Sequence, residues 1–292
     1  MYSSITMKFL RYLAYANFWL AIGAGLSVWM LYLVVNSPIN ILAILSLFFV
    51  TFSIYNLNRH AENELDIINH PGRVAFIRRY SKYLFPVALV SYLITILLSL
   101  IKSIEIFLLL LFPLVVVILY TANWVPNSLN LGFRRFKDIF IFKDVIVAFT
   151  WATTITFVGA LYQSFAINNL ILLFWSFLFL RFLVNVIVFD LRDIEGDSRQ
   201  KVKTIPVVLG KKKTRKLLYL LNASIVFSFS YVTFMGLMPP VMHIINLVSG
   251  LYTHLYISYT KNNDINYLCD VVVDGEYTVM WIAALIGTFI LA

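Results

Sequence analysis

The chain has 292 residues, of which 61% are hydrophobic, 16% are aromatic and only 13% are charged. Ordinary soluble domains carry about 25% charged residues, so this composition excludes a soluble globular enzyme, a disordered chain and a collagen-like array. The long, unbroken apolar segments predict an all-α polytopic membrane protein. With a formal net charge of +9, the expected partners are membrane lipids rather than nucleic acid.

The apolar segments predict about nine transmembrane helices, since each span needs roughly 20 apolar residues. In chain order the predicted spans are residues 10–35, 39–57, 83–101, 104–122, 144–163, 168–189, 216–237, 239–259 and 276–292. Short connections between them alternate with long, charged ones, which are residues 58–82, 123–143, 190–215 and 260–275. This alternation places all the long connections on one face of the membrane.

The basic residues predict which face that is. Of the 23 Lys and Arg residues, 21 lie in the N-terminal segment or around the long connections. The positive-inside rule therefore predicts that these connections are cytoplasmic and that the protein spans the cell membrane. Arg181 lies within a predicted span, so we expect it to face a polar partner inside the bundle.

Two rows of polar oxygen ligands follow the second and the sixth predicted spans. Asn58, Glu62 and Asp66 recur every four residues, and a second row is formed by Asp190, Asp193 and Asp197. On a helix, either spacing places its members on one face. Carboxylates stacked at a membrane edge repel one another unless a cation is present, and oxygen-only ligands favour Mg²⁺.

Basic residues near these rows would suit an anionic leaving group such as a diphosphate. The basic residues near the rows in sequence are Arg73, Arg134, Arg135, Lys137, Lys143, Lys201 and Lys203. Four spans separate the two acidic rows, which predicts a single domain over 1–292. Its two four-helix halves, roughly 1–122 and 123–292, would each supply one row to a shared central cavity.

Two segments carry a family resemblance. Asp66, Asn69, Pro71 and Arg73 match the D-x-x-N-x-P-x-R end of the first signature of UbiA-type intramembrane prenyltransferases. Residues 190–210, DLRDIEGDSRQKVKTIPVVLG, closely resemble the second signature of that family. The resemblance implies Mg²⁺-dependent transfer of an isoprenyl group from a polyprenyl diphosphate to a hydrophobic acceptor, an aromatic or lipid molecule, through an allylic carbocation.

The resemblance also implies roles for individual residues. The metal ligands would be Asn58, Glu62, Asp66, Asp190, Asp193 and Asp197. Asp190, Asp193 and Tyr120 would be catalytic, and the diphosphate would contact Arg73, Lys137, Lys143 and Lys203. This chain departs from the family pattern at Arg59, Glu62 and Lys201, where the family usually has Asp, Asp and Gly.

Two other functions fit parts of the pattern. A UbiA-type terpene cyclase would capture the cation within its own chain, so its product would contain no acceptor mass. A non-enzymatic lipid or isoprenoid transporter would carry ionisable residues scattered through its spans, whereas here the acids gather at span ends. Asp270 and Asp274 either complete a polar cap over the site or end a loop, and we favour the loop.

Overall fold

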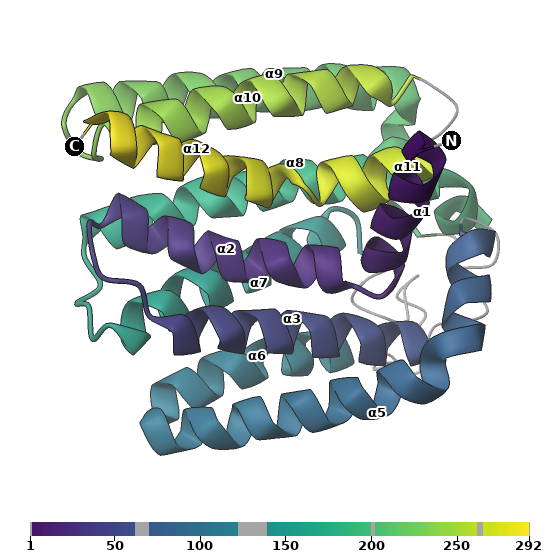
Figure 1. Cartoon of the computed structure of the whole chain (residues 1–292). Helices are drawn as coiled ribbons and strands as arrows, with labels where there is room; N and C mark the ends of the chain where they lie inside the picture. The colour runs from purple at the N-terminus through teal and green to yellow at the C-terminus, as the bar shows by residue number, and fades with distance from the viewer. Residues whose placement is uncertain (1, 62–69, 122–138, 200–201, 262–264, 292) are drawn as a thin grey trace, which may run out of the picture.

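The computed structural model describes residues 2–61, 70–121, 139–199, 202–261 and 265–291. Within these ranges the chain forms helices and no strand, as the all-α prediction requires. The helices lie side by side in one bundle (Figure 1). In chain order they are α1 (Tyr2–Tyr15), α2 (Phe18–Val34), α3 (Ile41–Ala61), α5 (Pro71–Lys102), α6 (Ile104–Thr121), α7 (Phe142–Tyr162), α8 (Asn169–Arg199), α9 (Ile205–Phe234), α10 (Val241–Tyr259), α11 (Ile265–Tyr267), the π-helix η3 (Leu268–Val273) and α12 (Glu276–Leu291).

Five of these helices are long and apolar enough to cross a membrane, namely α3, α5, α7, α8 and α9. The bent pair α1 and α2 makes a sixth if it is one span. Every predicted span has a helix in the structure, but the count of nine membrane crossings is not confirmed. Large apolar side chains such as Leu97, Phe227 and Phe289 are exposed on the bundle, as a lipid-facing surface requires. The protein is therefore an integral membrane protein.

The first predicted span, residues 10–35, is broken into two helices in the structure, whereas the sequence predicted a single helix. Asn17 adopts a left-handed conformation with φ 61°, which asparagine tolerates better than most residues, and α1 and α2 meet at 75°. The polar end of α3 contacts this break. Asn56 donates to the Ala16 carbonyl at 3.1 Å and Arg59 to the Tyr15 carbonyl at 2.9 Å. Arg59, a departure from the family pattern, thus satisfies a helix end that the break exposes.

Two predicted connections are largely helical. Helix α5 begins at Pro71 rather than near residue 83, because proline is well suited to the first turn of a helix. Helix α8 continues to Arg199 and so carries the second acidic row on regular helix. Helix α9 starts at Ile205 and is interrupted at Gly210, whose φ of 77° favours glycine.

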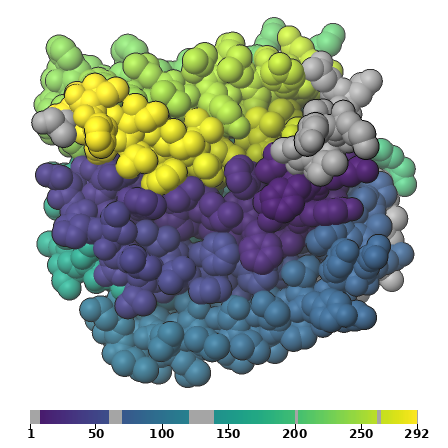
Figure 2. Space-filling view, in the orientation of Figure 1, coloured from purple at the N-terminus to yellow at the C-terminus, as the bar shows by residue number. Residues whose placement is uncertain are grey.

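The helices close into a ring through contact between α2 and α12, which join the N-terminal and C-terminal parts of the bundle (Figures 1 and 2). The short connections α2–α3, α5–α6, α7–α8 and α9–α10 lie together at one end (Figure 1). The opposite end holds α1, η3 and the ends of α3 and α8. The described parts of the long connections therefore share this end of the bundle, and the polar residues they carry gather there.

Candidate active site

The acidic row of α8 divides between two sets of partners. Asp190 is 1% exposed, and its Oδ1 accepts a 2.8 Å hydrogen bond from Lys143 Nζ. Asp197 Oδ2 lies 3.7 Å from the same Nζ atom. At 3.6 residues per turn, Asp197 is rotated from Asp190 by only about 20° and Asp193 by about 60°. Asp190 and Asp197 therefore share Lys143, whereas Asp193 turns toward other residues.

The start of α7 supplies a further carboxylate that the sequence reasoning did not single out. Asp144 is 1% exposed and lies against Asp190. Both Asp144 oxygens and Asp190 Oδ2 are buried without a hydrogen-bond donor among the described residues. Two buried carboxylates in contact with one lysine leave negative charge that an added cation would neutralise. The sequence signal that could have identified Asp144 is its position in the first turn of an apolar helix, directly after Lys143.

Asp193 belongs to a second cluster, centred on Arg192. Arg192 Nε and Nη2 donate to the two Asp193 oxygens at 2.9 and 3.1 Å, a bidentate pairing. Arg192 Nη1 donates to Asp270 Oδ1 at 3.0 Å. His70 Nε2 lies 3.1 Å from Asp193 Oδ1, and burial lowers the pKa of His70 in spite of that contact. This cluster links the start of α5, the end of α8 and η3.

The favoured interpretation of Asp270 as the end of a loop is wrong. Asp270 is buried in the π-helix η3, and its bond to Arg192 makes it part of the polar layer at this end of the bundle. Asp274 follows directly after η3. Burial, aided by repulsion from Asp270, raises the pKa of Asp274 to about 7. Both residues therefore complete a polar cap, which was the alternative considered from the sequence.

The other predicted site residues lie in several places. Arg73 is buried in the first turn of α5, close enough to His70 and Asp274 to affect the pKa of each. Asn58 is half-buried on α3, and Lys203 is exposed between α8 and α9. Tyr120 lies in the last turn of α6, and its side chain is not described. Glu62, Asp66 and Lys137 lie outside the described residues.

The first acidic row cannot therefore be placed against the second. Among the residues that the structure describes, no group of three or more His, Cys, Asp or Glu side chains is arranged to hold a metal ion. The predicted metal site, which needs both rows, stays a prediction.

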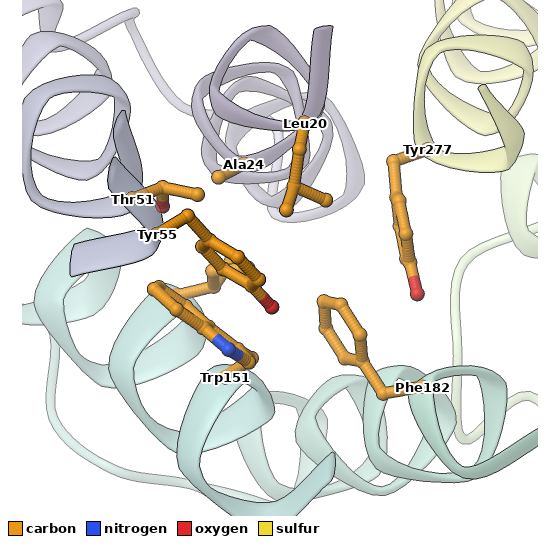
Figure 3. A pocket seen from close by; sticks show the side chains of 8 residues that line it. Leu20, Ala24, Thr51, Tyr55, Trp151, Phe182 and Tyr277 are labelled. Carbon is orange, nitrogen blue, oxygen red and sulfur yellow. The ribbon is translucent and has the colours of Figure 1, made fainter. Parts of the chain in front are cut away.

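An apolar cavity of about 20 Å³ lies within the helix ring (Figure 3). Its walls come from α2, α3, α7, α8 and α12 and consist of Leu20, Ala24, Thr51, Tyr55, Trp151, Ile155, Phe182 and Tyr277. The Tyr55 and Trp151 rings stack at 5.5 Å between centroids, and the Phe182 and Tyr277 rings stack at 4.6 Å. Aromatic faces thus form much of the wall of this space.

The cavity lies deeper in the bundle than the polar layer and on the same helices. Phe182 precedes Asp190 on α8 by eight residues, or about 12 Å at 1.5 Å per residue. Trp151 follows Asp144 on α7 by seven residues, or about 10 Å. A molecule with a charged head and an apolar tail could therefore contact both layers at once.

Arg181 also has the polar partner that was expected of a charge within a span. Its Nη1 atom donates to Asn222 Oδ1 at 2.8 Å and lies 3.9 Å from Glu276 Oε1. Glu276 in turn accepts hydrogen bonds from Thr253 at 2.9 Å and Tyr256 at 2.7 Å. This network is buried between α8, α9, α10 and α12, where it fixes helix packing.

The fold defines the protein as a helical intramembrane protein with a polar layer over an aromatic cavity. The model of the UbiA prenyltransferase family matches residues 17–269, and the chain belongs to this family.

Two curated relatives are both described as digeranylgeranylglyceryl phosphate synthase. The protein from Methanosphaera stadtmanae is 30% identical over 183 residues, which are 62% of each chain. The protein from Thermococcus gammatolerans is 31% identical over 168 residues, which are 54% of this chain and 52% of the relative. The chain thus spans between half and two thirds of the length of these relatives.

Among solved structures, a UbiA homologue from Archaeoglobus fulgidus bound to GPP and Mg²⁺ has a similar fold. Its TM-score is 0.64 at 16% identity, over 94% of this chain and 99% of that one. At this identity the likeness shows the fold alone.

Proposed function

We propose that the protein transfers an isoprenyl group from a polyprenyl diphosphate to a lipophilic acceptor. The observation that carries the proposal is the stacking of two layers in one helix ring. Asp144, Asp190 and Lys143 form a charged layer, and about 10–12 Å deeper the rings of Trp151 and Phe182 line an apolar cavity. A prenyl diphosphate has the matching division between an anionic head and a hydrocarbon tail.

The reaction begins when the bond between C1 of the prenyl group and the diphosphate oxygen breaks, with both electrons leaving on the diphosphate. Lys143 and Arg73 are the cations in the described part of the site that would stabilise that anion. The allylic cation would face aromatic rings, each worth about 0.5–2 kcal/mol toward a nearby cation. The apolar wall keeps water from the cation, so that the acceptor captures it.

The residues present fit Mg²⁺. The buried oxygens of Asp144 and Asp190 that lack a donor among the described residues are hard ligands of the kind Mg²⁺ binds. We propose that Asp190 and Asp197 hold the metal together with Asn58, Glu62 and Asp66, and that Asp144 supports them. Bound there, Mg²⁺ would neutralise charge that develops on the departing diphosphate.

Asp193 has a different role in this proposal, because Arg192 and His70 occupy its two oxygens. It would ligate the metal only after exchanging one of these partners. These contacts support a role in orienting Arg192 at the edge of the site.

We further propose that the acceptor is a glyceryl phosphate lipid rather than an aromatic ring. The support is the description of two relatives, at 30% and 31% identity, as digeranylgeranylglyceryl phosphate synthase. The 21 basic residues in the N-terminal segment and around the long connections support a cytoplasmic orientation of the site in the cell membrane.

The test is an incubation of the purified protein with prenyl diphosphates of several lengths, Mg²⁺ and a prenylated glyceryl phosphate. We expect release of diphosphate and a product whose mass is the sum of the acceptor and the prenyl group. EDTA should stop both, and added Mg²⁺ should restore them. A product without acceptor mass would instead indicate the cyclase, and uptake into proteoliposomes without any chemistry would indicate the transporter.

A further inference from the structure

The hydroxyl of Tyr277 is buried without a hydrogen-bond partner among the described residues. Tyr277 is 2% exposed and lines the aromatic cavity. The other buried tyrosines of the described chain all have a partner for this group. Tyr32 donates to the Gly159 carbonyl, Tyr92 to the Leu110 carbonyl and Tyr256 to Glu276, while Tyr162 shares a hydrogen bond with Ser46. A buried donor left unsatisfied is costly, and because this one borders a cavity it is available to a ligand.

Packing fixes the ring of Tyr277 in place. The ring stacks on Phe182 with an angle of 26° between the planes. The Cβ atom of Tyr277 packs against Gly23 of α2. A Cβ atom added at Gly23 would lie only 3.3 Å from the Cβ atom of Tyr277. Figure 3 shows the ring on the wall formed by α12, opposite Thr51 and Tyr55. Thr51 contributes a second buried hydroxyl to the cavity that has no partner among the described residues.

The proposed substrates leave one candidate for this hydroxyl. The prenyl chain is a hydrocarbon and offers no hydrogen-bonding atom. The diphosphate belongs with the charged layer, next to Lys143 and Arg73. Tyr277 lies three residues beyond Asp274, so α12 carries its ring between the charged layer and the Phe182 ring on which it stacks. The phosphate of a glyceryl phosphate acceptor is anionic and belongs with the cations of the charged layer. The polar group that remains for the apolar cavity is the nucleophile of the acceptor.

We propose that the Tyr277 hydroxyl binds the hydroxyl group of an alcohol-bearing lipid acceptor and holds its oxygen toward C1. This inference rests on the proposed function and deepens it by naming the acceptor's reacting group. As the bond between C1 and diphosphate breaks, the acceptor oxygen forms a new bond to C1. The proton of the acceptor goes to the released diphosphate, and Tyr277 keeps its own. Tyr277 is thus a catalytic residue that selects alcohols.

The test compares Tyr277→Phe with Tyr256→Phe, because each change removes one hydroxyl from a buried ring. Tyr277→Phe should lower kcat/KM for the glyceryl lipid by about tenfold or more, the equivalent of about 1.4 kcal/mol. Its KM for the prenyl diphosphate and its Tm should stay within error of the unmodified protein. Tyr256→Phe breaks the bond to Glu276 and should lower the Tm instead.

A deoxy acceptor, used as a competitive inhibitor, supplies a second measurement. Loss of the acceptor hydroxyl should weaken binding to the unmodified protein but change binding to Tyr277→Phe much less. Thr51→Val, which is nearly isosteric, should reduce acceptor kcat/KM by a smaller factor.

Two failures can be told apart. If Tyr277→Phe matches the unmodified protein in acceptor kinetics and in binding of the deoxy acceptor, the assignment of Tyr277 is overturned while prenyl transfer stands. If the unmodified protein releases no diphosphate from any prenyl diphosphate, the proposed function itself has failed.

Discussion

Helix α8 carries two groups of buried charges that lie nine residues apart. They differ in how many of their polar atoms have a hydrogen-bond partner. Around Arg181, both Glu276 oxygens accept hydrogen bonds and both terminal nitrogens of the arginine donate them, and the arginine Nε alone lacks an acceptor among the described residues. Around Asp190, one Asp190 oxygen and both oxygens of Asp144 lack a donor among the described residues. A satisfied network fixes packing, whereas unmet carboxylate oxygens are free to bind something else. The same helix therefore separates a structural group of charges from the group that we propose to be functional.

The largest expected effect is on stability, at the structural group. Arg181→Met should lower the free energy of unfolding by about 3–5 kcal/mol, because it leaves the buried Glu276 carboxylate without its cation. Thermal unfolding in detergent measures this loss. The double variant Arg181→Met with Glu276→Leu should recover a large part of it. If Arg181→Met unfolds at the same temperature as the unmodified protein, the structural interpretation of this network is wrong.

The next effect is on turnover, at the functional group. Asp190→Asn should reduce diphosphate release by about 10²–10³-fold, the loss typical of a single group that stabilises charge in a transition state. Its stability should stay near that of the unmodified protein, because the change removes the repulsion between Asp190 and Asp144. Diphosphate release and Tm are measured on the same sample. If Asp190→Asn retains full activity, the proposed functional role of the charges around Asp190 is wrong.

A third effect concerns pH. The Asp274 carboxyl, whose pKa burial raises from 3.8 to about 7, is preferentially protonated in the folded protein. Its contribution to stability is therefore fully present below the unfolded pKa and is lost as the pH rises through the folded value. The unmodified protein should lose stability relative to Asp274→Asn between about pH 4 and pH 7. Denaturant unfolding of both proteins across this range measures the difference, and parallel curves would contradict it.

The helices and the second acidic row could be predicted from local sequence. Apolar segments specify helices wherever water is absent, and the three-and-four spacing of Asp190, Asp193 and Asp197 needed only helical geometry. The break at Asn17 was missed because the sequence stays apolar through it, and the backbone change involves one residue.

The contacts of the site could not be predicted in the same way. Arg192 and Asp270 are 78 residues apart in the chain, and His70 and Asp193 are 123 apart. Such pairs form only through the order in which helices pack around the ring, and no spacing rule encodes that order. Asp144 was missed for the same reason, since its importance depends on α7 lying beside α8.

The contact between α2 and α12 has a consequence for biogenesis. The aromatic cavity takes one wall, Tyr277, from α12, while the opposing walls come from helices inserted much earlier. During synthesis the growing polypeptide has no enclosed chamber until α12 docks against α2. An immature chain would thus lack the dry surroundings that the proposed carbocation needs, so we expect activity only after α12 has docked.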